Sequence, residues 1–119
     1  MRALVIEPQV FASFMIEDAL RDAGFTSVTL VRSEEEALAA ADQDPPDLIT
    51  AAVELDPGSG IEAVRRICAK RSAPVLFITK APATVESEAP GAAVLRKPFV
   101  AADLPPAIER AKRHLRQAA

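Results

Sequence analysis

The feature that most constrains the fold is a fivefold alternation of short, β-branched apolar runs with segments of helical periodicity. A nearly continuous apolar run is typical of a strand buried on both faces, as in a parallel sheet. Right-handed crossovers between such strands place the intervening helices on both faces of the sheet. The pattern predicts a single α/β domain over residues 1–119, doubly wound around five parallel strands. The strands are expected at Ala3–Glu7, Ser27–Val31, Asp47–Val53, Pro74–Thr79 and Ala93–Arg96.

Capping residues and apolar spacing indicate where the helices lie. Ser33 and Glu36 form one capping box and Ser59 and Glu62 form another, so a helix is expected to begin at each. A helix is also expected over about 11–23, ending near Gly24, and a last one occupies the C-terminal segment. The apolar residues at helical spacing are Phe11, Met15, Ala19 and Ala23; Ala37, Leu38 and Ala41; Ile61, Val64 and Cys68; and Leu104, Ile108, Ala111 and Leu115.

The interval between the fourth and fifth strands gives the weakest helix signal. Pro82 and Pro90 bracket only the short segment Ala83–Ala89, which allows about two helical turns at most. We expect a shortened helix or an irregular loop there.

Composition excludes several classes of protein. Half of the residues are hydrophobic, which suffices for a packed core and excludes a disordered chain. The single cysteine, Cys68, cannot form an internal disulfide, so a stapled secreted scaffold is excluded. No apolar run approaches the roughly 18 residues of a membrane helix, and Ala3–Ile6 is too short for a signal peptide. A soluble, cytoplasmic protein is expected.

The charges are distributed unevenly along the chain. Residues 1–62 carry 3 basic and 13 acidic side chains, whereas residues 63–119 carry 11 and 4. Such asymmetry can steer an oppositely charged partner, although it is also compatible with an ordinary solvated surface. It leaves open a homodimer in which the acidic early helices of one copy meet the basic last helix of another.

Ligands of doubly wound sheets collect at the carboxyl ends of the strands, beside the point where strand order reverses. The chemistry-bearing residues are therefore sought directly after each predicted strand. They are Glu7, Pro8 and Gln9; Ala52 to Asp56; Thr79 and Lys80; and Lys97 and Pro98.

These strand ends, together with the Gly58-Ser59-Gly60 helix start and the Lys97-Pro98-Phe99 sequence, resemble the receiver domain of bacterial two-component response regulators. The resemblance covers essentially the whole chain. It implies a flavodoxin-like (βα)₅ fold with strand order 2-1-3-4-5 and a phosphoryl-accepting pocket at the carboxyl edge of the sheet.

The resemblance also implies that the phosphorylation pocket is degenerate. The aspartate that accepts the phosphoryl group corresponds to Ala52, and the acidic pair that holds Mg²⁺ corresponds to Glu7 and Pro8. A methyl group is no nucleophile, and one remaining carboxylate is a poor magnesium site. We therefore expect no phosphorylation, metal, cofactor or enzymatic activity. The alternative is a displaced acceptor, Asp56 or Glu54, although neither is expected to be positioned for in-line transfer.

Two elements of the family pocket remain, Thr79 and Lys97. They either preserve an anion pocket or hold the local loop conformation, and the second interpretation is preferred. The resemblance further suggests a cis Lys97–Pro98 bond. Because a buried, unpaired lysine is costly, we predict a salt bridge between Lys97 and Glu7 across the site that Ala52 leaves empty.

The parts that transmit a signal in receivers are also altered. The aromatic switch residue three positions before the lysine corresponds to Val94, and the stretch from Thr79 to Lys97 is shorter than usual by about one helical turn. We therefore expect a constitutive protein-interaction module in two-component signalling, with a kinase, effector or other regulator as partner. The candidate surface combines Ala93–Arg96, Asp103–Arg116 and segment 80–91.

The basic residues of this candidate surface are its most specific feature. Cations near a helix C-terminus complement the helix dipole, which accounts for two or three of them. Nucleic-acid binding is disfavoured because no aromatic side chains accompany them. The candidate partner-binding residues are Arg96, Arg110, Lys112 and Arg113.

Overall fold

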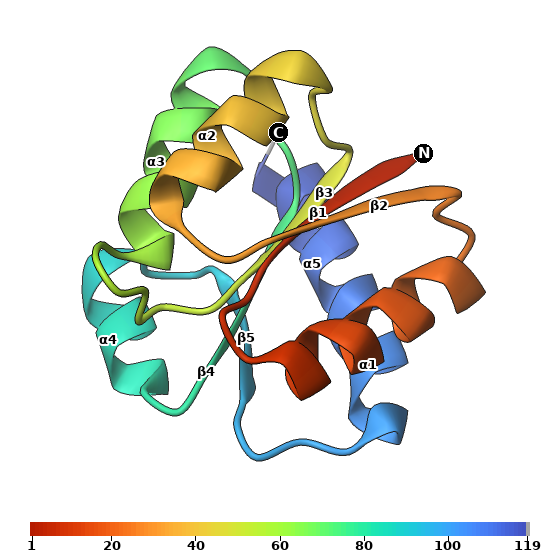
Figure 1. The fold of residues 1–119 in the computed structure, drawn as a ribbon. Coiled ribbons are helices and arrows are strands. Elements are labelled where there is room, and N and C mark those ends of the chain that lie inside the picture. Colours follow the sequence, from red (N-terminus) through yellow and green to blue (C-terminus); the bar gives the residue numbers. More distant parts are fainter. Residues whose placement is uncertain (119) are drawn as a thin grey trace.

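The computed structural model describes residues 1–118, and the side chains of residues 1–113. Strands and helices alternate along the chain (Figure 1). The elements are β1 (Arg2–Ile6), α1 (Val10–Asp22), β2 (Ser27–Val31), α2 (Glu34–Gln43), β3 (Leu48–Ala51), α3 (Gly60–Lys70), β4 (Val75–Thr79), α4 (Pro82–Glu88), β5 (Ala93–Arg96), a 3₁₀ turn at Ala101–Asp103 and α5 (Leu104–Ala118).

The five strands form one parallel sheet in the order β2-β1-β3-β4-β5, which confirms the predicted fold. Helices α2 and α3 cover one face, and α1 and α5 cover the other (Figure 1). The order reverses direction at β1, so the loops that follow β1 and β3 flank the same crevice. Nothing in the described residues is both long and apolar enough to form a membrane-crossing helix.

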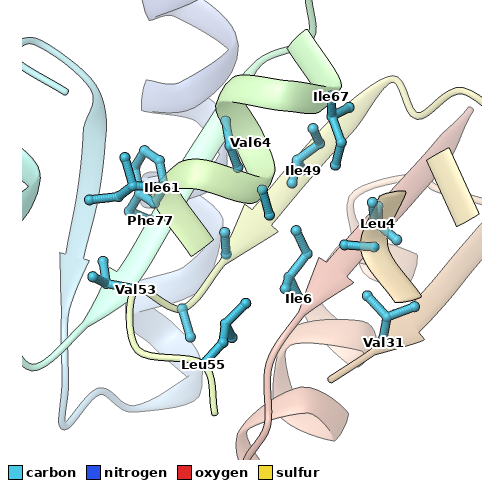
Figure 2. Packing of buried hydrophobic residues seen from close by; sticks show 14 of the residues in the cluster. Leu4, Ile6, Val31, Ile49, Val53, Leu55, Ile61, Val64, Ile67 and Phe77 are labelled. Atoms are coloured by element: carbon cyan, nitrogen blue, oxygen red, sulfur yellow. The ribbon is translucent and has the colours of Figure 1, made fainter. Parts of the chain in front are cut away.

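The core beneath α2 and α3 is built from apolar side chains of strands β1 to β4 and helices α2 to α4. Ile61, Val64 and Ile67 of α3 lie over Ile49 of β3 and Phe77 of β4 (Figure 2). The high alanine content places small residues between these larger ones. This face of the sheet therefore positions α3, and with it the loop that leads from β3 into the helix.

On the other face, α1 buries the residues whose spacing predicted it only in part. Its buried side chains are Ala12, Ser13, Ile16 and Leu20, and Phe11 is 85% exposed. The helix itself is confirmed, and Met15, Ala19 and Ala23 of the predicted stripe are partly buried against this core, whereas the inward placement of Phe11 was wrong. Ile16 and Leu20 pack against the sheet and α5 instead, which turns Phe11 towards solvent.

Two expectations about the strands were also wrong in detail. The edge strands β2 and β5 are only partly buried, because each has a single neighbouring strand. Strand β3 is shorter than the predicted Asp47–Val53, since the carbonyl of Val53 accepts a hydrogen bond from the amide of Gly60 at 2.8 Å. The chain therefore leaves the sheet at Ala52 and turns into α3.

The helix ends follow the sequence signals closely. The Ser33 hydroxyl accepts a hydrogen bond from the Glu36 amide, and the Ser59 hydroxyl accepts from the Ile61 and Glu62 amides. The weak fourth segment is the seven-residue helix α4. Leu104, Ile108 and Ala111 are buried as predicted, whereas the side chains of His114, Leu115 and Arg116 lie outside the described residues.

Candidate functional site at the carboxyl edge of the sheet

A small cavity of about 120 Å³ lies where four strands end. Its wall combines residues from the loops after β1, β3, β4 and β5, which are far apart in the sequence but adjacent at this edge. The structure thus brings together six of the predicted pocket residues: Glu7, Pro8, Ala52, Glu54, Thr79 and Lys97. Pro98 lines a neighbouring hollow, and its bond to Lys97 is cis, as predicted.

The predicted ion pair between Glu7 and Lys97 is confirmed. Lys97 Nζ lies 2.9 Å from Glu7 Oε1 and donates a hydrogen bond to Oε2 at 3.1 Å. The contact with Oε1 is an ion pair without a hydrogen bond. The two side chains are 10% and 1% exposed, and such burial makes each charge depend on the other.

Gln9 completes this pair and was missed at the sequence level as its partner. The Gln9 side-chain oxygen accepts a hydrogen bond from Lys97 Nζ at 3.0 Å, and the Gln9 amide donates to Glu7 Oε2 at 3.1 Å. The only available signal was its place two residues after Glu7, where a loop can fold back on a strand end. With Gln9, the lysine ammonium has three oxygen neighbours inside the fold.

Ala52 is buried and lies against the start of α3. Its amide donates to the Ile6 carbonyl at 2.8 Å, which holds it beside the end of β1. Its own carbonyl approaches Gly60 so closely that a Cβ there would lie 1.6 Å from the oxygen. Only glycine allows this approach, so Gly60 determines how the loop after β3 closes over the cavity.

The Thr79 hydroxyl is used in the local turn. Its Oγ1 accepts a hydrogen bond from the Ala81 amide at 2.9 Å, and the residue is 4% exposed. This contact stabilises the entry into α4, in agreement with the structural interpretation of Thr79. Lys97 is likewise engaged by Glu7 and Gln9.

The two displaced acceptor candidates lie in the loop between β3 and α3. Glu54 is exposed at the rim of the cavity, whereas Asp56 is exposed and does not line it. Strand alternation was the argument for Glu54, but β3 ends at Ala51, so the loop rather than the pleat sets the direction of this side chain. Lys97 forms its ion pair with Glu7 and with neither of these carboxylates.

The carboxylates at this edge form no cluster suited to a metal. Among the described residues, no three histidine, cysteine or acidic side chains gather in a metal-binding arrangement. Glu7 is the buried carboxylate at the cavity, and its oxygens already face an ammonium group. The arrangement is suited to neutralising Glu7 internally rather than to holding a divalent cation.

The candidate interaction residues divide between two sides of α5. Arg110 donates a hydrogen bond to the carbonyl of Val94 on β5 at 3.2 Å, and Arg96 is exposed on the same strand. Lys112 turns away from them and lies 5.3 Å above the Phe25 ring, beside Glu109. Arg113 is exposed. The structure thus groups Arg96 with Arg110 and assigns Lys112 a packing contact.

Comparisons with known proteins identify the same kind of domain over nearly the whole chain. The family model described as "Response regulator receiver domain" matches residues 3–109. Transcriptional regulatory protein PdtaR of Mycobacterium tuberculosis is 32% identical over 120 residues, which is 98% of this chain and 58% of that protein. A protein-glutamate methylesterase/protein-glutamine glutaminase of Haloarcula marismortui is 38% identical over 78 residues, or 66% of this chain and 21% of that protein.

Solved structures give the same result for the fold. The solution NMR structure of the Erythrobacter litoralis PhyR response regulator REC domain matches with a TM-score of 0.84 and 28% identity. That match covers 94% of this chain and 89% of the other. By contrast, the chain spans less than two thirds of the curated relatives that it matches in sequence.

Proposed function

The chain belongs to the response regulator receiver domain family of two-component signalling, and on that premise we propose that it takes no phosphoryl group and binds signalling proteins constitutively. In this proposal it is a cytoplasmic interaction module without enzymatic activity. The observation that carries the proposal is the methyl group of Ala52 at the end of β3, where the family resemblance places the acceptor.

The electrostatics of the cavity support the proposal. Phosphoryl transfer depends on positioning an acceptor in line with the donor and on cations that neutralise developing charge. Here the Lys97 ammonium is already neutralised by Glu7 and hydrogen-bonded to Gln9. The cavity therefore has no carboxylate at the position of the family's acceptor, and its buried lysine is already paired; the other lysine on its wall, Lys80, is exposed to solvent.

The altered signalling face also supports constitutive action. Val94 replaces the aromatic switch residue that the resemblance calls for, and its carbonyl is held by Arg110. Helix α4 has seven residues and buries a single side chain, Val85. We infer that this face presents one conformation to a partner, with Arg96, Arg110 and Arg113 as its exposed cations. An acidic surface on a kinase, effector or other regulator is the complementary partner.

Exposure to a small-molecule phosphodonor tests the proposal. The chain is incubated with acetyl phosphate and Mg²⁺, and intact mass is measured; each phosphoryl group would add about 80 Da. We expect no increase for the wild type. Amide chemical shifts recorded with beryllofluoride, a phosphoryl mimic, are expected to remain unchanged.

Three variants make the result interpretable. An increase in mass that Asp56→Asn or Glu54→Gln abolishes would overturn the proposal and identify a displaced acceptor. A Pro8→Asp/Ala52→Asp variant serves as the positive control for donor quality, since it restores the acceptor carboxylate and the second acid of the magnesium pair. Modification of Pro8→Asp/Ala52→Asp but not of the wild type is the outcome that supports a permanently unmodified receiver.

A further inference from the structure

The outward face of α1 carries most of the large apolar side chains that the described part of the chain exposes. Val10 is 51% exposed, Phe11 85% and Phe14 54%, and the other exposed large apolar residues are Met1 and Val100. We call Val10, Phe11 and Phe14 the α1 apolar patch. Clustered exposure of this kind, as opposed to scattered single residues, marks an interaction surface.

The α1 apolar patch borders a hollow of about 450 Å³. Its walls include Met15 of α1 and Phe99 of the loop after β5, and Lys80 of the loop after β4 lies at its edge. An aromatic side chain from another molecule would be received between apolar walls, with a cation beside it. Phe11 of this chain stands on the rim of the same hollow, so the patch offers both a projecting ring and a recess.

The exposed charges around this face differ in sign between the two ends of α1. Lys80 is exposed beside the N-terminal end of α1, whereas Asp18 and Asp22 are exposed on its C-terminal half. Glu17 and Arg21 pair with each other at 3.0 Å. Within the described residues, no ion pair is formed by Lys80, Asp18 or Asp22. One end of the face is thus basic, its middle apolar and its other end acidic.

We propose that a second copy of this chain docks on this face, with the two α1 helices antiparallel about a two-fold axis. In a two-fold interface each surface element meets its counterpart on the same patch. When Phe11 of one copy lies opposite Phe14 of the other, Asp18 comes level with residue 7 of the other copy, about one helical turn ahead of that copy's Phe11. Lys80 lines the cavity at the carboxyl edge together with Glu7, and the hollow beside α1 together with Gln9.

In the antiparallel arrangement the basic end, the apolar middle and the acidic end of the face each meet a complementary part of the other copy. The aromatic rings of both copies are removed from water together, and each Asp18 meets a Lys80. Antiparallel helix dipoles add a favourable term, because the N-terminal end of each α1 faces the acidic half of the other. A parallel arrangement would place lysine beside lysine and aspartate beside aspartate.

This pairing differs from the one suggested by net charge along the sequence, in which α1 or α2 would meet the basic α5. It also does not depend on the proposed lack of phosphorylation, since Phe11 and Phe14 lie outside the cavity that contains Ala52. Failure of one proposal therefore leaves the other standing.

Sedimentation velocity from micromolar to millimolar chain concentration tests the proposal. We expect a reversible monomer–dimer equilibrium for the wild type. The double variant Phe11→Gln/Phe14→Gln should raise the dissociation constant by roughly tenfold or more. Its matched control is Ala39→Gln, an exposed position on α2, which should dimerise like the wild type. Circular dichroism verifies that both variants keep the fold.

A charge exchange tests the antiparallel arrangement itself. Asp18→Lys and Lys80→Glu should each weaken the dimer, and the two together should restore it, because the ion pair is re-formed in reverse. A wild type that stays monomeric at every concentration would overturn the proposal and leave the patch to a different protein. So would a dimer that survives the double glutamine variant. If the losses of dimer affinity caused by Asp18→Lys and by Lys80→Glu simply add in the double variant, the antiparallel α1–α1 alignment is refuted.

Discussion

Glu7 and Lys97, 90 residues apart in the sequence, form an ion pair that is nearly shielded from solvent, with Nζ 2.9 Å from Oε1. The pair joins the loop after β1 to the end of β5 across the strands between them. Removing one partner of such a pair leaves an uncompensated buried charge, which costs far more than the loss of an exposed salt bridge.

The Lys97→Met variant is therefore expected to lower the free energy of unfolding by about 3–5 kcal/mol. Urea unfolding followed by circular dichroism measures the change. Lys80→Met is the matched control, because Lys80 is exposed beside the same cavity and its replacement should change stability by no more than about 0.5 kcal/mol. The double variant Glu7→Gln/Lys97→Met should recover part of the loss. If Lys97→Met and Lys80→Met had equal free energies of unfolding, this account would be contradicted.

Most of the fold could be predicted from local patterns, and the exceptions have physical causes. The alternation of apolar runs and capping boxes sufficed for the element order and for a parallel sheet, whereas the strand order was predicted from the resemblance to receiver domains. The buried face of α1 could not be assigned, because Phe11 and Met15 have the same helical spacing as Ala12, Ile16 and Leu20. Only the packing against β1 and α5 decides between these two stripes.

In the candidate site, the partner of a buried charge could be predicted from the sequence. Contacts that depend on the orientation of a loop or a helix could not. A lysine at a buried strand end requires a counter-charge, and topology left Glu7 as the nearest one. Gln9 could not be identified as the third member, since loop geometry controls its contact. The contact of Lys112 with Phe25 was equally hidden, because it depends on how α5 rotates over the segment that precedes β2.

Magnesium should leave the wild-type chain unaffected. A magnesium site is usually built on one or two carboxylates, and the buried one here is occupied by Lys97. We expect no change in the amide chemical shifts of residues 7–9 and 52–54 at millimolar Mg²⁺. The variant Pro8→Asp/Ala52→Asp should show shifts that are reversed by EDTA.

The uncharged pair Pro8→Asn/Ala52→Asn is the control for this magnesium prediction, because it has nearly the same shape without the charges. It should behave like the wild type. Magnesium-dependent shifts in the wild type at these residues would mean that Glu7 leaves Lys97 to bind the metal, against the geometry of the pair.

Cys68 provides a prediction about pH. Burial on α3 raises the pKa of its thiol above the ordinary value of 9.0, against a smaller lowering by a hydrogen bond with the Ala73 backbone. A raised folded-state pKa means that the folded chain retains its proton where the unfolded chain loses it. The associated stability is therefore complete below the unfolded pKa and is lost as pH rises through the folded pKa.

The stability difference between wild type and Cys68→Ala should accordingly shrink from about pH 8 to about pH 10, on either side of the ordinary thiol pKa. Urea unfolding of both proteins measures it. Iodoacetamide should also modify the folded chain more slowly than the urea-unfolded chain at the same pH, since the thiolate is the nucleophile. Equal rates would show that the thiol is not protected by the fold.

Gly60 should be irreplaceable because of close contact rather than backbone conformation. Its ideal Cβ would lie 1.6 Å from the Ala52 carbonyl oxygen and 2.8 Å from the carbonyl carbon, and neither backbone atom can move without disturbing the loop after β3. Gly60→Ala is expected to cost about 3 kcal/mol or more, at or beyond the upper end of ordinary overpacking.

A substitution at Gly24 distinguishes the effect of close contact at Gly60 from the effect of backbone conformation alone. It has a positive φ of 103° with nothing within 4 Å of an added Cβ, so Gly24→Ala should cost only the left-handed strain of about 1–2 kcal/mol. Thermal and urea unfolding of the two variants measure both losses. The larger loss must belong to Gly60→Ala, and it should be accompanied by amide shift changes at Ala52 and Val53. If Gly24→Ala were the more damaging substitution, the approach of α3 to Ala52 would not be what determines the closure of the loop.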